Sequence, residues 1–269
     1  MSRGRITVLV IASALCLVVA APAAQADTVT MGSTLQNDFD GGISTGPTLT
    51  VQLSYAPATS PNPVISPANG VITGWKVKSA DDGALYTLKV MRSNGPVSLV
   101  SATNTNFTAV RSLVAPNSVP AGTGGTTPTG VIFSYPGPLA ISEGDYIGLL
   151  TGGADDDVPQ KTTNGVTANV FANNFTGLPA DGSAANLLAD EQHDLLLQAT
   201  VEFCKVPKLK GKKGKAAKKA LAAADCGVKV AKKRAKKKKQ RGKVIKQKQK
   251  AGFTAAPGTE IAITVGKKG

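Results

Sequence analysis

The stretch LLLQATVEF, residues 195–203, decides the fold class because its side chains alternate between two faces. One face carries Leu195, Leu197, Ala199, Val201 and Phe203, and the other carries Leu196, Gln198, Thr200 and Glu202. A period of two gives a β-strand one buried face and one wetter face, which is typical of antiparallel sheets. The stretch therefore predicts a half-buried strand that closes an antiparallel β domain.

The same alternation recurs upstream, in residues 71–78, 86–90 and 131–135. Trp75 and Val77 share a face, which predicts core packing for the only tryptophan rather than a platform for a sugar ring. The 29 Gly, the 16 Pro and the low aromatic content of 4% favour many short strands joined by turns. Residues 27–203 are therefore expected to form a jelly-roll-like, two-sheet antiparallel β-sandwich, within a chain that is mainly β.

Charge divides the 269-residue chain at the end of this predicted domain. Residues 1–203 contain 8 Lys and Arg against 15 Asp and Glu, whereas residues 204–269 contain 23 against 2. The whole-chain net charge of +14 therefore describes neither part. This split excludes a uniformly basic protein and predicts a second domain over residues 204–269.

Residues 1–26 have the features of a secretory signal peptide. Two arginines precede an apolar run that is shorter than the roughly 20 residues of a membrane span, and small residues at positions 24 and 26 precede a cleavage site at Asp27. We expect the signal to be removed, which leaves no transmembrane anchor. The localisation predicted from this pattern is secreted, extracellular and associated with the cell envelope.

Removal of the signal leaves two cysteines, Cys204 and Cys226. In an exported protein such a pair favours a disulfide over a metal site, because structural zinc needs about four N or S ligands. The only histidine, His193, lies outside this segment, and no histidine is near enough in sequence to suggest a base for a reactive thiol. The pattern predicts a Cys204–Cys226 disulfide, with free thiols as the alternative.

Acidic groups in the predicted sandwich are the candidates for chemistry. They are Asp38 with Asp40, the three aspartates at 155–157, and Glu143 with Asp145. Loop carboxylates can bind calcium and paired carboxylates can hydrolyse glycosides, but neither loop has calcium-loop spacing, and a turn explains Glu143 and Asp145 equally well. His193 has no nucleophile motif beside it and is predicted to be a surface residue. We therefore nominate no catalytic residue, no cofactor and no metal site, and expect a protein that is not an enzyme.

Residues 204–269 show a different pattern, a helix followed by three strands. Alanines and a leucine share one face of residues 215–224, and Cys226-Gly227 is expected to end this helix. Strands are expected from Val228, over residues 242–245 and over residues 261–265. This pattern predicts a small α+β module, with one helix packed on a three-stranded sheet.

The module resembles the PASTA domain, a small repeat found outside the cell in bacterial serine/threonine kinases and penicillin-binding proteins. In order, the matching pieces are Val206-Pro207 with Leu209 and Gly211, the Ala-rich helix, Gly227, residues 242–247, Ala251-Gly252, residues 257–259 and residues 261–265. Gln249 stands where the family commonly has proline. The resemblance covers about a quarter of the chain and does not extend to the predicted sandwich. It implies an α+β fold and, for some members, binding of peptidoglycan fragments, whereas other members are spacers.

The basic residues of the module are nearly all lysines, with 21 Lys and two Arg. The predicted polyanion-binding residues are Lys232, Lys233, Arg234, Lys236, Lys237, Lys238, Lys239 and Arg241. Lysine is a diffuse point charge, which suits retention on an anionic polymer, although a solvated face that keeps the module soluble is the alternative. Nucleic acid is not expected as a partner, because Phe253 is the only aromatic residue available for base stacking and the chain is predicted to be exported.

These observations predict an exported, non-catalytic cell-envelope protein. Its basic PASTA-like module is expected to bind cell-wall peptidoglycan or another anionic envelope polymer and to display the β-sandwich. The alternative is that the sandwich itself acts on extracellular polysaccharide as a hydrolase, or binds carbohydrate or mediates adhesion.

Overall fold

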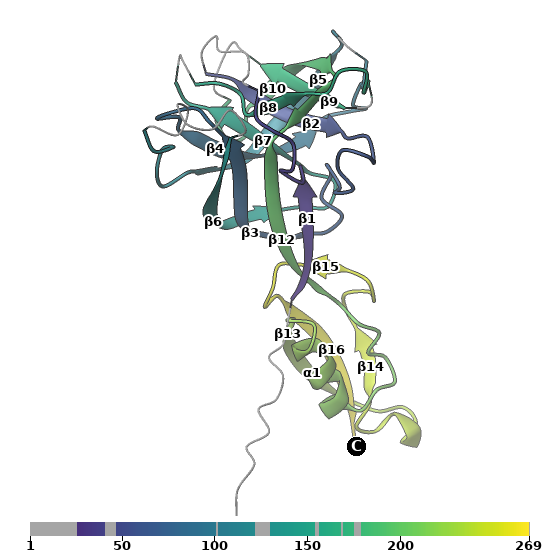
Figure 1. Cartoon of the computed structure of the whole chain (residues 1–269). Helices are drawn as coiled ribbons and strands as arrows, with labels where there is room; N and C mark the ends of the chain where they lie inside the picture. The colour runs from purple at the N-terminus through teal and green to yellow at the C-terminus, as the bar shows by residue number, and fades with distance from the viewer. Residues whose placement is uncertain are drawn as a thin grey trace, which may run out of the picture.

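The computed structural model describes residues 26–40, 47–100, 102–121, 130–153, 156–167, 169–174 and 179–268. The predicted signal peptide lies, apart from Ala26, outside the described residues, as does Asp155 of the acidic group at 155–157. In the described chain a β-rich body is followed by a smaller module, and the long strand β12 runs from one to the other (Figure 1).

The first layer of the body is an antiparallel sheet. Its strands, in spatial order, are β1 (Asp27–Gly32), β12 (Leu197–Lys205), β3 (Gly70–Ser79) and β6 (Val131–Ile141). The quoted stretch 195–203 forms most of β12, which pairs with β1 on one side and with β3 on the other. The sequence pattern therefore located the central strand of this sheet.

The second layer closes on itself as a barrel of antiparallel strands. In spatial order these are β10 (Ala184–Glu191), β5 (Asn104–Val114), β4 (Tyr86–Ser93), β7 (Tyr146–Thr151), β2 (Leu49–Ser54) and β9 (Val170–Asn174). Two short strands, β8 (Gln160–Thr162) and β11 (His193–Leu195), form a separate pair. The prediction of a mainly β chain with packed antiparallel sheets is confirmed, with the addition that one sheet is closed.

The body has two hydrophobic cores. One lies between the first sheet and the β4–β7 wall of the barrel, where Trp75 and Ile72 meet Leu88 and Leu149. The second, which includes Phe107, fills the barrel. Trp75 is 2% exposed and its ring centroid lies 4.4 Å from that of Tyr135. The predicted core position of Trp75 is confirmed.

One face of strand β12 packs in the core of the body, and the opposite face packs in the core of the module. Leu197, Ala199 and Val201 are buried in the body core, whereas Cys204 is buried in the core of the module. Phe203 is half-buried and belongs to neither core cluster, so the prediction that it continues the apolar face of Val201 was wrong. The buried face changes between Val201 and Cys204 because the strand leaves one core and enters the other.

Hydrogen bonds join the module to the body beside this strand. The short strand β15 (Thr254–Ala255) pairs with the end of β12, and the Asn69 amide of the body donates to Thr254 Oγ1 at 2.9 Å. The Asn69 side chain in turn accepts from the Glu143 amide at 3.2 Å. The domain boundary expected at residue 204 therefore falls inside the continuous strand β12. Hydrogen bonds also link the body and the module next to this boundary.

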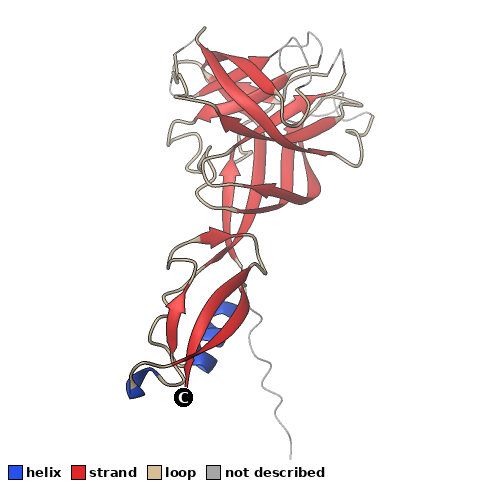
Figure 2. Cartoon of the chain, turned by 180° about the vertical axis from the view of Figure 1, so that it is seen from behind, coloured by secondary structure: helices blue, strands red, loops and turns tan. Residues whose placement is uncertain are grey.

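The module consists of one helix on a three-stranded sheet, as predicted. Its elements are α1 (Gly214–Ala222), β13 (Gly227–Arg234), the 3₁₀ helix η1 (Lys238–Gln240), β14 (Val244–Gln247) and β16 (Glu260–Lys267). The sheet order is β13-β16-β14, with β13 parallel to β16 and β14 antiparallel to it. Ala217 and Leu221 of the helix are buried with Ile261 and Ile263 of the central strand. Figure 2 shows the helix behind the sheet and the opposite face of the sheet toward the viewer.

The helix ends earlier than the sequence predicted. It ends at Ala222, the chain turns through Asp225 at a φ of 49°, and the Cys226 amide donates to the Leu221 carbonyl at 2.9 Å. Gly227 instead begins β13, where an added Cβ would lie 2.4 Å from the Gly258 carbonyl oxygen. This glycine therefore allows a close approach of two backbones and does not stop the helix.

Among the described residues, none of the helices is long and apolar enough to cross a membrane.

Candidate polyanion-binding surface

The disulfide and a small apolar core hold the module together. The structure joins Cys204 and Cys226, whose Cα atoms are 5.2 Å apart, and both side chains are buried. The bond connects the end of β12 to the residue directly before β13. It therefore fixes the incoming strand against the start of the sheet that carries the basic residues.

The eight predicted polyanion-binding residues are all exposed at one end of the module. Three of them, Lys232, Lys233 and Arg234, form the last part of β13, and Lys236 to Arg241 follow in the turn that contains η1. In Figure 1 this turn lies at the tip of the module that is farthest from the body, next to the C-terminus. The sequence run is therefore a single surface in the structure, called the basic tip below.

A glycine on the central strand shapes the basic tip. The loop after β13 folds back over Gly266, where an added Cβ would lie 2.5 Å from the Gln240 carbonyl oxygen and 3.1 Å from the Ala235 Cβ. The Ala235 amide donates to the Lys267 carbonyl at 3.1 Å and thereby ties the start of the loop to β16. A side chain at position 266 would push this loop away from the strand.

Two arginines line one hollow at the basic tip. Arg234 pairs with Lys267 in the parallel ladder and Arg241 forms a bridge with Gly266, so the two arginines take neighbouring positions along β16. Arg234, Ala235, Lys236 and Arg241 line a hollow of about 390 Å³. The spacing of Arg234 and Arg241 in the sequence does not by itself indicate that they line the same hollow.

Acidic residues are far from the basic tip. Glu260 begins β16 and pairs with Gly227, and the Asp225 carbonyl accepts from the Gly258 amide, so both acids lie at the end of the sheet nearest the body. The eight residues of β16 span roughly 23 Å. No Lys or Arg of the module, as described over residues 204–268, forms an ion pair. The positive charge of the tip is therefore not neutralised within the module.

A second lysine-lined hollow lies on the face of the sheet opposite the helix. Its volume is about 410 Å³, and it is lined by residues of β13 and β16 that include Ala231, Ala262 and Thr264. Lys229, Lys246 and Lys248 line it as well. These three lysines are not among the residues that the sequence predicts to bind a polyanion. The spacing of Lys246 and Lys248 was the available signal, because alternate residues of an extended chain share a face.

The acidic loops of the body are engaged in internal contacts. Asp38 and Asp40 form ion pairs with Lys78 at 3.5 Å and Lys161 at 3.4 Å. Asp156 accepts hydrogen bonds from the amides of its own loop, including that of Gly153 at 2.6 Å. In the parts of the body that the structure describes, no group of three His, Cys, Asp or Glu is arranged to hold a metal ion.

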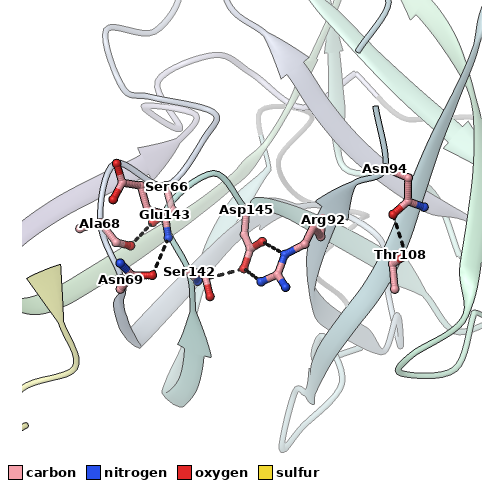
Figure 3. Close-up of polar contacts among 9 residues, drawn as sticks. All are labelled: Ser66, Ala68, Asn69, Arg92, Asn94, Thr108, Ser142, Glu143 and Asp145. Atoms are coloured by element: carbon pink, nitrogen blue, oxygen red, sulfur yellow. Dashed lines mark hydrogen bonds and ion pairs between the residues drawn. The ribbon is translucent and has the colours of Figure 1, made fainter. Parts of the chain in front are cut away.

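Glu143 and Asp145 do not form a carboxylate pair. The Asp145 side chain is 1% exposed and accepts two hydrogen bonds from the Arg92 guanidinium, at 2.7 and 3.0 Å. It also accepts from the Ser142 amide at 2.9 Å. The Glu143 side chain is exposed and points away from Asp145 (Figure 3). Asp145 therefore fastens a turn to β4, and the glycosidase arrangement is absent at this pair.

The buried carboxyl of Asp194 has the most perturbed titration among the carboxyl groups of the described body. Burial raises the pKa of Asp194 to about 6, although hydrogen bonds from Asn37, Ser33 and Tyr55 act in the opposite direction. The Asn37 side-chain amide donates to Asp194 Oδ2 at 2.5 Å. His193, predicted to lie at the surface, is half-buried on β11, with its Nδ1 3.5 Å from Asp190. The buried Asp194 side chain therefore joins β11 to the segment that carries Asn37.

The comparison with protein families identifies the module. Residues 205–267 match the family model of the PASTA domain. The resemblance read from the sequence is thereby confirmed over the length of the module. PASTA domains are typically non-catalytic binding modules associated with the bacterial cell wall. No curated protein and no solved structure matches the chain significantly, and the family match does not extend to the body.

Proposed function

We propose that this is an exported, non-catalytic envelope protein whose PASTA module holds it on an anionic cell-wall polymer and displays the β body. In this proposal residues 1–26 are a cleaved signal peptide, residues 27–203 are the displayed body and residues 204–269 are the attachment module. The polymer is peptidoglycan or another anionic component of the wall. The eight basic residues of the tip make the main contacts.

The observation that carries the proposal is the isolation of the positive charge. The module holds 23 basic residues, and those of the tip are exposed and without ion pairs within the described module. The turn that carries most of them lies at the end of the module farthest from the body (Figure 1). Like charges held close together on a small domain repel one another and are stabilised by a partner of opposite charge. An anionic wall polymer supplies that partner along its whole length.

The body carries a net negative charge, opposite in sign to the charge of the module. Residues 27–203 carry 6 Lys and Arg against 15 Asp and Glu. An anionic surface therefore attracts the module and repels the body, which orients the chain with its basic tip toward the polymer. The continuous strand β12 and the contact between Asn69 and Thr254 support this orientation, because they restrict rotation of the body relative to the module.

Sedimentation of the chain from Asp27 with purified cell wall tests the proposal. We expect binding at low salt that weakens steeply as sodium chloride is raised, because the Debye length falls from about 30 Å at 0.01 M to about 10 Å at 0.1 M. The first variant replaces Lys236, Lys237, Lys238 and Lys239 with Gln. The matched control replaces Lys205, Lys208, Lys219 and Lys250 with Gln; these lysines are also exposed but lie outside the basic tip.

The two variants have the same net charge and separate a localised site from diffuse attraction. The proposal predicts that the tip variant loses most of its binding while the control retains most of it. If the intact chain stays in the supernatant at low salt, the attachment function is wrong. If the control variant loses as much binding as the tip variant, the assignment of the contact to the basic tip is wrong.

A further inference from the structure

The two arginines of the module occupy the same hollow, although 21 of its 23 basic residues are lysines. Arg234 and Arg241 line this hollow together with Lys236. A random distribution of two arginines over the module would seldom place both at one site. The arrangement depends on Gly266, which lets the loop between them fold onto β16.

Arginine differs from lysine in the anions that it recognises. The guanidinium is a planar fork with several donors and binds carboxylate or phosphate with two parallel hydrogen bonds, whereas the ammonium of lysine is a compact point charge. A carboxylate has both oxygens in one plane and is satisfied by one such fork. A phosphate is tetrahedral, so its oxygens point in several directions and accept from donors on different sides.

We infer that the hollow lined by Arg234, Lys236 and Arg241 is a phosphate-binding site. This inference rests on the proposed function and names the chemistry of the polymer as a phosphodiester chain. Arg234 at the end of β13, Lys236 in the turn and Arg241 at the bridge to β16 line the hollow, so its basic residues come from three segments. A volume of about 390 Å³ exceeds that of a single phosphate group and holds a phosphate with part of its chain.

The surroundings of the hollow favour a polymer without bases. Nucleic acids also carry phosphodiesters, but non-specific recognition of single strands relies on aromatic side chains for stacking. The aromatic residue of the module, Phe253, lies directly before β15 at the end of the module nearest the body, and its carbonyl accepts from the Val206 amide. The residues of the basic tip therefore offer positive charge and guanidinium groups, but no aromatic side chain on which a base could stack.

The surroundings also disfavour a lipid headgroup. Proteins that lie on a bilayer add apolar side chains that enter the boundary between headgroups and acyl chains. In the described module the exposed large apolar side chains are Val230, in the middle of β13, and Phe253, near the body. Neither belongs to the basic tip. A phosphodiester polymer in solution or in the wall therefore fits the site better than a phospholipid surface.

Competition between two defined polymers tests the inference with the chain from Asp27. The probes are a synthetic poly(glycerol phosphate) oligomer and a poly-γ-glutamate oligomer with the same number of charges, measured by titration at one salt concentration. We expect roughly tenfold tighter binding of the phosphate polymer, because the guanidinium groups of Arg234 and Arg241 form charge-assisted hydrogen bonds with it. Vesicles of phosphatidylglycerol, at the same phosphate concentration, are expected to bind more weakly than the oligomer.

The decisive variant changes arginine chemistry without changing charge. Arg234→Lys with Arg241→Lys is expected to abolish the phosphate preference, because it lowers the affinity for the phosphate polymer more than the affinity for poly-γ-glutamate. The control, Lys205→Gln with Lys208→Gln, removes two charges that lie outside the hollow. It is expected to lower the affinity for both polymers by the same factor. Equal affinity of the intact chain for the two polymers, an unchanged preference in the double Arg→Lys variant, or tighter binding to vesicles than to the oligomer would each overturn the phosphate site.

Failure of this inference is distinguishable from failure of the proposed function. A chain that binds the wall and both polymers without preference retains the attachment function and has no phosphate site. A chain that binds neither the wall nor either polymer contradicts both.

Discussion

The body and the module are both built from β-sheet, but they differ in what holds them together and in where their charges point. The body has two apolar cores and engages charged side chains internally, as in the Arg92–Asp145 pair. The module has one small core with a disulfide, and its basic residues face solvent. We therefore expect stability and the proposed attachment to depend on separate parts of the chain, and the predictions below test that separation.

The largest effect is expected from the body core. Trp75→Ala removes a side chain that is buried between the first sheet and the barrel, and such changes cost about 3–5 kcal/mol of unfolding free energy. Hydrogen exchange read by mass spectrometry should show lost protection in β3 and β4, with β14 and β16 unchanged. The control is Val114→Ala at an exposed position of β5, which should stay within about 0.5 kcal/mol. Equal loss of protection in β14 and β16 would show that the two parts unfold as one unit.

The disulfide is expected to have the next largest effect, confined to the module. Closing a loop with a sequence separation of 22 contributes about 3 kcal/mol in the chain-entropy account, which is a large share for a domain of this size. Replacing both cysteines with Ala should therefore open β13, β14 and β16 in hydrogen exchange while the barrel keeps its protection. Unchanged exchange in the module would contradict this role.

The bond itself has a simple chemical test. For the chain from Asp27 unfolded in denaturant, iodoacetamide should add no mass before reduction and two carbamidomethyl groups after reduction, because Cys204 and Cys226 are then its only cysteines. Modification of both thiols without a reductant would show that the pair is free.

The buried carboxyl of Asp194 should make the body sensitive to pH. Burial holds the folded pKa at about 6, above the ordinary value of 3.8, so the folded state keeps a proton that the unfolded state loses. This group's contribution to stability is therefore fully present below about pH 4 and is lost as the pH rises to about 6. Asp194→Asn should raise the unfolding free energy at pH 7 by about 2–3 kcal/mol and leave it unchanged near pH 4. Denaturant unfolding at both pH values measures this, and equal effects at the two values would contradict the account.

The smallest effect is expected where the body meets the module. Thr254→Val removes the hydroxyl that accepts from the Asn69 amide, and a lost hydrogen bond of this kind costs about 1 kcal/mol. The Asn69 amide should then exchange about fivefold faster in NMR measurements, while the ladder between β15 and β12 remains. Thr73→Val, at an exposed position of β3, serves as the control. No change at Asn69 would show that this contact does not join the two parts.

Much of the fold was predictable because burial alternates locally along each strand. Residues 195–203 and 71–78 indicated β12 and β3, and the order of motifs after Cys204 indicated the helix and sheet of the module. Pairing partners depend on register between distant segments, which alternation does not specify. The closure of the barrel by β9 and the change of buried face along β12 were for that reason not predicted.

The candidate site was predictable in composition but not in shape. The run of lysines identified the basic tip, because charge density is visible in the sequence. That Arg234 and Arg241 line the same hollow depends on the missing side chain of Gly266 and on a bridge to β16, and neither has a local signal in the sequence.

Chemical footprinting of lysines tests the central claim most directly. The chain from Asp27 is acetylated with a small reagent, free and bound to purified wall at low salt, and each lysine is quantified by mass spectrometry. The account predicts that Lys236, Lys237, Lys238 and Lys239 are protected on binding, whereas Lys76 and Lys161 of the body react as they do in the free chain. Equal labelling of the tip in both states, or protection of the body lysines instead, would contradict attachment through the module.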